Sequence, residues 1–211
     1  MLFDALIITS MLSIFAVSHS ILASHKFKLE ITKILGDKIA FYRLFYNILS
    51  ILFFMFIYFL LPKPNYLIYD LTFPFDIAIV ILQIISGIFL IWAAEAINIK
   101  EFLGISQIIR FWKKEYSLDD LDEKMELIVD GPFKYSRHPI YLFSSLFLIL
   151  RPTMDFFYLV FLINMILYFY IGSYYEEKKL LTIFGNDYLE YQKNVPKIFP
   201  KIKLWYKWNS Y

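Results

Sequence analysis

Long apolar stretches separated by short basic segments dominate the chain. We expect membrane-spanning helices over Leu2–Ala23, Phe41–Leu61 and Ile77–Ile99, because about 20 consecutive apolar residues cross a bilayer. Two further apolar runs, Tyr141–Leu150 and Phe156–Tyr175, follow. Ten helical residues rise only ~15 Å, so this last pair predicts a hairpin that enters the membrane fully or partly and returns to the side it left. The pattern predicts an all-α integral membrane bundle of about five membrane segments.

The most polar segment, Lys113–Glu126, interrupts this pattern. We interpret it as a solvated loop or a short surface helix capped by Ser117 or Asp119. The chain then divides into an N-terminal three-span bundle, residues 1–99, and a second region, residues 100–211, that holds the hairpin.

Composition supports a membrane protein and excludes several other classes. The chain is 59% hydrophobic with a mean hydropathy of +0.56, whereas soluble domains are about 45–50% apolar. A net charge of +2 does not suggest nucleic acid as a partner, and the absence of cysteine excludes disulfides and thiolate metal sites. The first apolar run lacks a basic leader, so we expect a retained span rather than a cleaved signal.

The basic residues predict an orientation. All of them except Lys63 and Arg151 lie in the segments 24–43, 100–138 and 178–207. Because cytoplasmic loops carry the excess of Lys and Arg, we expect the N-terminus outside and the C-terminus inside, in a cytoplasmic or inner membrane. The two segments with candidate chemistry then face the cytoplasm, where a soluble cofactor is available.

The first of these segments is Gly131-Pro132-Phe133-Lys134-Tyr135-Ser136-Arg137-His138-Pro139-Ile140-Tyr141. Gly131-Pro132 ends whatever precedes it, and Pro139 suits the first turn of a helix. Free N–H groups at a helix start favour an anionic group, and Arg137 and His138 add donors there. The alternative is a basic interfacial anchor before a membrane segment.

The second segment begins with Glu176-Glu177 and continues through Phe184-Gly185 to Val195-Pro196. Carboxylates directly after an apolar helix lie near its negative end, an unfavourable position that suggests a cationic partner. Arg137 or a cationic cofactor would serve, and the alternative is a solvated pair balanced by neighbouring lysines. Asn186–Lys193, with Tyr188 and Tyr191, predicts an amphipathic helix that covers the site.

Together the two segments resemble the membrane methyltransferases of the isoprenylcysteine carboxyl methyltransferase and phospholipid methyltransferase superfamily, over about residues 100–200. The resemblance implies a methyltransferase-like region, residues 100–211, that binds S-adenosylmethionine (SAM) at its cytoplasmic side. No G-x-G arrangement is present, so the usual dinucleotide fingerprint is absent. The cofactor-binding residues implied by the resemblance, or placed with them by us, are Gln107, Leu127, Ile128, Gly131, Phe133, Arg137, His138, Pro139, Ile140, Tyr141 and Glu176 or Glu177.

The rest of the chain is similar to a different branch of this superfamily. The prenylcysteine branch has other residues at Met125 and Phe133 and an arginine near Gly172, which argues against a prenylated cysteine as acceptor. The segments 19–24, 42–47, 101–107 and 152–154 are similar to the bacterial methanethiol S-methyltransferases, which methylate a small volatile thiol with SAM.

Polar residues inside the predicted spans are candidates for the acceptor pocket, because ionisable groups in a membrane are costly. We expect His19, Arg43 and Glu95 to be catalytic, with an Arg43–Glu95 pair and either His19 or Glu95 as proton acceptor. Asn47 and Asn98 would line the pocket. The alternative is hydrogen bonding between helices that holds the bundle together.

The sequence therefore predicts a SAM-dependent membrane methyltransferase, with a small thiol as the preferred acceptor. A phospholipid or other lipid acceptor stays open. One rival function is a sterol-type membrane reductase with a reduced nicotinamide cofactor, against which Pro139-Ile140 argues. The other is a non-enzymatic membrane scaffold. No metal site is expected, because the histidines show no metal-ligand spacing.

Overall fold

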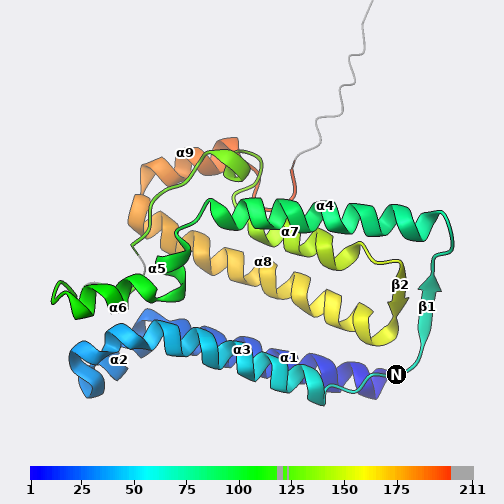
Figure 1. Ribbon diagram of the computed structural model, residues 1–211, viewed down its shortest axis with the longest axis horizontal. Helices are drawn as coiled ribbons and strands as arrows, with labels where there is room; N and C mark the ends of the chain where they lie inside the picture. The colour runs from blue at the N-terminus through cyan, green and yellow to red at the C-terminus, as the bar shows by residue number, and fades with distance from the viewer. Residues whose placement is uncertain (118–120, 123, 201–211) are drawn as a thin grey trace, which may run out of the picture.

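The computed structural model describes residues 1–117, 121, 122 and 124–200, and most of them are helical. Figure 1 shows the helices lying side by side along one long direction. The helices and strands are, in chain order, α1 (Leu2–Ala23), α2 (His25–Leu35), α3 (Tyr42–Leu60), β1 (Leu67–Asp70), α4 (Phe75–Glu95), α5 (Ile99–Leu103), α6 (Ile105–Trp112), α7 (Pro139–Ile149), β2 (Thr153–Asp155), α8 (Phe156–Phe184) and α9 (Asn186–Asn194).

Within the described residues, four helical stretches are long and apolar enough to cross a membrane. They are α1, α4, α8 and the continuous stretch His25–Leu60 that contains α2 and α3. The apolar helix α7 has only 11 residues, about 16 Å of rise. The mostly helical fold is thus confirmed, and its four candidate spans fit a membrane bundle. The predicted count of about five membrane segments stays a prediction. The predicted bounds of α1 are reproduced, and those of α3 differ by one residue at each end.

The expectation that Glu176 and Glu177 follow the end of a helix is wrong. Helix α8 continues past them to Phe184 and ends at Gly185, which has a φ of +54°. Its start is capped by Asp155, whose carboxylate accepts a hydrogen bond from the Tyr158 N–H at 2.7 Å. Both glutamates therefore lie inside a continuous helix of 29 residues. This helix is about 44 Å long, which is longer than the hydrocarbon core of a bilayer.

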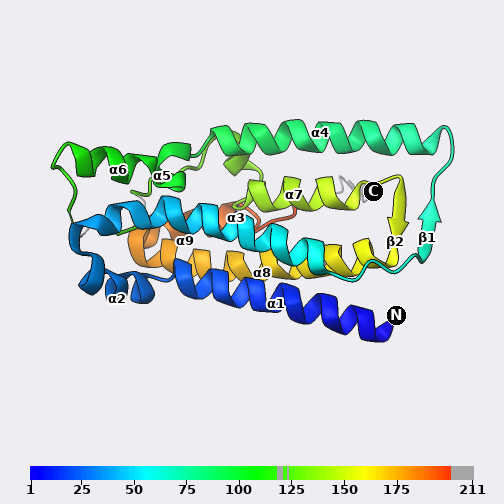
Figure 2. The ribbon, with the colours of Figure 1, turned by 60° about the horizontal axis from the view of Figure 1, so that its bottom comes forward.

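The bundle packs in two groups. Helix α8 lies against α1, while α4 lies against α7, as Figure 2 shows. One core cluster joins α1, α3 and α8 through Ile8, Leu12, Ile57, Leu61, Phe157 and Phe161. Because each half of the chain contributes helices to this packing, the division at residues 99 and 100 stays a prediction.

The two ends of the bundle differ in construction. At one end β1 and β2 pair antiparallel, with Leu67 opposite Asp155 and Asp70 opposite Thr153. The opposite end holds α2, α5, α6 and α9 (Figure 1). We call these the strand end and the motif end.

The polar segment Lys113–Glu126 lies at the motif end, and its described residues after Lys114 form no helix. The proposed cap Asp119 lies outside the described residues. The expected solvation does not hold for Asp122, whose side chain is 24% exposed and pairs with Lys28 of α2 and, at 3.5 Å, with Lys179 of α8.

Candidate active site

The two motif segments meet at the start of α7. The backbone N–H of Arg137 donates to the Pro196 carbonyl at 2.9 Å, and that of His138 donates to the Lys197 carbonyl at 3.0 Å. The buried Ser136 hydroxyl also donates to Lys197, at 3.2 Å. Pro139 is the first residue of α7, as predicted. The chain beyond α9 therefore fixes the position from which the Arg137 and His138 side chains project.

Arg137 forms a buried ion pair with Glu177. Its Nε and Nη2 atoms lie 2.8 and 2.7 Å from Oε1 of Glu177, and both side chains are at most 13% exposed. The remaining donor, Nη1, reaches the carbonyls of Gln192 and Val195 at 3.0 and 2.6 Å. One guanidinium thus ties α8 to the end of α9 and engages Oε1 of Glu177.

His138 lies between the two glutamates. Its Nε2 is 3.4 Å from Oε1 of Glu177, and its Nδ1 is 3.4 Å from Oε2 of Glu176. The Tyr141 hydroxyl donates to Glu176 at 3.1 Å, and the Tyr141 ring stacks between those of His138 and Phe169. The Glu176 side chain is nevertheless 42% exposed, against 13% for Glu177, so Glu176 is the carboxylate open to a further ligand.

Helix α9 covers this site with two tyrosines. The Tyr191 hydroxyl donates to the Phe133 carbonyl at 2.5 Å, and burial raises its pKa to about 12. Burial and the neighbouring Glu177 raise the pKa of Tyr188. Tyr188 is only 1% exposed, and its hydroxyl has no hydrogen-bond partner among the residues that the structure describes. Both hydroxyls therefore stay protonated donors at neutral pH.

The other residues predicted to bind the cofactor lie in two places. Leu127 and Ile128 are half-buried in the extended segment before Gly131. Gln107 is instead held in a buried cluster of α5 and α6, where its amide donates to Glu101 at 3.3 Å. Arg110 donates to the same carboxylate at 2.5 Å. Burial alone would raise the pKa of Glu101, but Arg110 outweighs it and the pKa lies below its ordinary value.

Of the five polar residues predicted to share one acceptor pocket, the structure brings Arg43, Asn47 and Asn98 together at α5. Arg43 and Asn47 donate to the Phe102 carbonyl at 2.9 and 3.1 Å. Asn98 caps α5 by accepting from the Glu101 N–H at 3.1 Å. Glu95 is exposed at the end of α4, and the Arg43–Glu95 pair stays a prediction. Arg43, Asn47 and Asn98 satisfy backbone groups of α5, which is the kind of structural hydrogen bonding that the sequence left open as the alternative.

The elbow between α5 and α6 explains that arrangement. Gly104 has a φ of +90°, and a Cβ atom built there would lie 2.7 Å from the Leu44 backbone nitrogen. The elbow therefore approaches α3 too closely for any other residue, and Arg43 and Asn47 fasten it there.

His19 forms a separate cluster between α1 and α3. Its Nδ1 lies 3.1 Å from the Ser50 hydroxyl, and its Nε2 lies 2.8 Å from the Tyr46 hydroxyl. Ring contacts of 5.2 to 6.4 Å between centroids then connect His19 to His138 through Tyr168, Phe169 and Tyr141. A row of contacting aromatic rings thus connects His19 with His138.

Sequence reasoning missed two members of this arrangement, Tyr46 and Tyr168. It placed Tyr188 over the site, but nothing in the sequence indicates that its hydroxyl lacks a partner among the described residues. Tyr46 lies in the segment 42–47, four residues after Tyr42 and therefore on the same face of the helix, so the sequence contained a signal for it. Tyr168 sits in an aromatic run of α8 that gives no local signal.

Comparisons with known proteins agree with the predicted branch. The chain is 26% identical over 93% of its length to a methanethiol S-methyltransferase of Crocosphaera subtropica, and 28% identical over 93% to methanethiol S-methyltransferase 1 of Bradyrhizobium diazoefficiens. It is 38% identical over 36% of its length to a methanethiol S-methyltransferase of Pseudomonas deceptionensis. These matches span 75%, 67% and 31% of the respective relatives. No family model and no solved structure matches the chain.

Proposed function

We propose that this chain, a relative of the methanethiol S-methyltransferases, is an integral-membrane methyltransferase that transfers a methyl group from SAM to a small thiol. The observation that carries the proposal is the accessible carboxylate of Glu176 beside His138 and Tyr141, in a chain similar to those enzymes over most of its length. The motif end faces the cytoplasm, as the basic residues predict.

The residues at the motif end fit SAM chemically. A carboxylate that is 42% exposed suits the ammonium or sulfonium group of SAM, and Glu176 has that exposure. The buried hydroxyl of Tyr188, which lacks a partner among the described residues, offers a donor to a polar group of the cofactor. Both side chains lie around the Arg137–Glu177 pair.

The two glutamates take different roles in this proposal. Glu177 is a positioning residue, because Arg137 already occupies its carboxylate and ties α8 to the chain beyond α9. Glu176 holds the cofactor, and His138 and Tyr141 orient its carboxylate. The other implied cofactor residues, Leu127 and Ile128 among them, would provide apolar contacts.

The cofactor would supply a methyl group on a positively charged sulfur, which would become a neutral thioether when the methyl group is transferred. The acceptor thiol would gain the methyl group and lose its proton. His19 is the proposed proton acceptor, and Tyr46 and Ser50 hold its ring. The acceptor thiol would then bind along the row of aromatic rings that separates His19 from His138. Holding both reactants in line and excluding water supplies most of the rate. Arg43 is a positioning residue that fixes α5.

The test is methyl transfer from labelled SAM by detergent-purified protein, with methanethiol, longer alkyl thiols, phosphatidylethanolamine and a prenylcysteine as acceptors. We expect label in the small thioether. His138→Ala should abolish transfer, and His19→Gln should lower kcat while SAM affinity stays unchanged. His25→Ala is the matched control, because His25 is 59% exposed on α2.

Label in the lipid instead of the thiol would keep the enzyme class and overturn the acceptor. If no acceptor is labelled and SAM fails to raise the melting temperature, the proposal is wrong, because a ligand that binds the folded state must stabilise it.

A further inference from the structure

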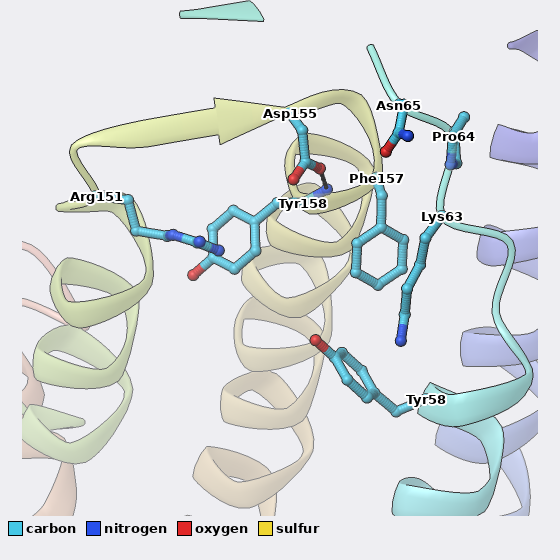
Figure 3. Close-up of a pocket in the computed structure, with 8 residues that line it drawn as sticks. All are labelled: Tyr58, Lys63, Pro64, Asn65, Arg151, Asp155, Phe157 and Tyr158. Carbon is cyan, nitrogen blue, oxygen red and sulfur yellow. Dashed lines mark hydrogen bonds between the residues drawn. The ribbon is translucent and has the colours of Figure 1, made fainter. Parts of the chain in front are cut away.

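The two basic residues outside the three basic segments line the same cavity. Lys63 follows α3 and Arg151 follows α7, and both border a cavity of about 230 Å³ at the strand end. Its other lining residues are Tyr58, Pro64, Asn65, Asp155, Phe157 and Tyr158, and Figure 3 shows the two cations directed toward aromatic rings within it. A cavity bordered by two cations suits an anionic ligand.

Neither cation forms an ion pair with a carboxylate of the described residues. Lys63 Nζ lies 4.7 Å from the ring centre of Tyr58 and 5.8 Å from that of Phe157. The Arg151 guanidinium lies 4.0 Å from the ring centre of Tyr158. The carboxylate in the lining, Asp155, is used as the cap of α8. Ring faces attract cations weakly, so both charges keep the capacity to bind an anion.

The direction of the Lys63 side chain supports the same inference. Lysines at a membrane boundary normally extend their charge outward into water. Lys63 runs from its loop back toward Tyr58 on α3, along the cavity, while the residue as a whole stays exposed (Figure 3). The rings stabilise its charge weakly, and an anionic oxygen in the cavity would stabilise it further.

The depth of the cavity indicates where such an oxygen comes from. Helix α3 ends at Leu60, α7 ends at Ile149 and α8 starts at Phe156, so the cavity lies where the apolar stretches end and lipid headgroups begin. Phe59 and Leu60 beside it are 70% and 54% exposed, and they give acyl chains an apolar surface continuous with α3.

We propose that this cavity binds the phosphate of a phospholipid headgroup from the leaflet at the strand end. Lys63 and Arg151 contact the phosphate oxygens, the aromatic rings form the walls, and the acyl chains lie along α3. The site is independent of the methyl-transfer chemistry at the other end of the bundle.

The experiment measures lipid retention by native mass spectrometry of the detergent-purified full chain. Wild-type protein is titrated with dioleoylphosphatidylglycerol and with dioleoylglycerol, which has the same chains and no phosphate. We expect the phospholipid to bind at least tenfold more tightly. Equal binding of the two lipids would overturn the proposal without the use of any variant.

A variant pair then locates the site. K63Q/R151Q should weaken phosphatidylglycerol binding about tenfold, whereas K63R/R151K should retain it. K26Q/K38Q is the matched control, because it removes two exposed charges at the motif end and should bind like wild type. Undiminished binding by K63Q/R151Q would contradict the proposal, as would full displacement of the lipid by millimolar inorganic phosphate, which would indicate a soluble-anion site.

Discussion

The two ends of this bundle hold their charges in different ways. At the motif end, cations meet carboxylates: Arg137 meets Glu177, Arg110 meets Glu101, and Lys28 meets Asp122. At the strand end, Lys63 and Arg151 meet aromatic faces instead. The motif end thus uses ion pairs to fix the positions of its helices, whereas the cations at the strand end keep the capacity to bind a ligand.

The largest expected effect is the loss of Arg137. Arg137→Ala leaves the buried Glu177 carboxylate without its guanidinium, with His138 still 3.4 Å away, and leaves two carbonyls of the α9 region without their donor. We expect a loss of about 3–5 kcal/mol in the free energy of unfolding, the usual result of breaking a buried pair. Denaturation in detergent measures it, with the exposed neighbour Lys134→Ala as control. A loss below about 1 kcal/mol would mean that the pair is solvated and that the contrast between the ends is wrong.

A smaller effect is expected from the elbow that carries the second ion pair. Gly104→Ala combines a φ of +90° with a Cβ 2.7 Å from the Leu44 nitrogen. We expect a loss of about 3 kcal/mol, of which about 1–2 kcal/mol comes from the backbone conformation. Gly87→Ala is the control, because a Cβ at Gly87 in α4 meets only the Phe147 ring at an ordinary 3.6 Å. Denaturation in detergent measures both variants, and a loss below about 1 kcal/mol for Gly104→Ala would show that the elbow yields without strain.

Acid should weaken the motif end through Asp122. Burial would raise its pKa, but Lys28, Lys179 and His25 outweigh it and hold the pKa to about 2, against an ordinary value of 3.8. A depressed pKa stabilises the fold above pH ~4, and this stability is lost as the pH falls to about 2.

After allowance for partial exposure, the contribution of Asp122 is about 1–2 kcal/mol. Denaturation curves at pH 5 and pH 2.5 measure it. Asp122→Asn should be less stable at pH 5 and should lose less on acidification than wild type. An identical acid response in both proteins would remove Asp122 from the account.

The smallest effect belongs to the strand end. Arg151→Gln and Lys63→Gln should each lower the free energy of unfolding in lipid-free detergent by about 0.5–1 kcal/mol, since exposed cation–π contacts contribute only that much. The loss should be the same at pH 5 and pH 2.5. A loss as large as that of Arg137→Ala would mean that these cations are structural, and the two ends would then be alike.

The spans and the meeting of the two motif segments were predictable because they rest on local patterns. A run such as Leu2–Ala23 needs no partner to be recognised, and Pro139 and Pro196 mark a helix start and a helix stop by their own chemistry. The resemblance to the methanethiol S-methyltransferase branch rested on short segments of this kind and is confirmed by relatives that match most of the chain.

Long-range contacts were not predictable in the same way. The sequence indicates that Arg43 and Asn47 share a helix face. It does not indicate that the elbow at Gly104 approaches this face, where both side chains bind the Phe102 carbonyl. The sequence likewise left Glu176 and Glu177 equivalent, because adjacent residues of a helix point in different directions and the position of Arg137 decides which one is engaged. The strand-end cavity draws most of its lining from the α3–β1 loop, the α7–β2 loop and the start of α8, and no sequence motif connects these segments.

The most direct test of the account compares SAM binding by Glu176→Gln and Glu177→Gln in detergent, by isothermal titration together with melting temperatures. The account predicts that Glu176→Gln weakens SAM binding at least tenfold and leaves the melting temperature of the cofactor-free protein near that of wild type. It predicts that Glu177→Gln lowers the melting temperature of the cofactor-free protein more than Glu176→Gln does. The reverse pattern, with a stable Glu177→Gln that fails to bind SAM and an unaffected Glu176→Gln, would contradict the assignment of Glu176 as the cofactor carboxylate.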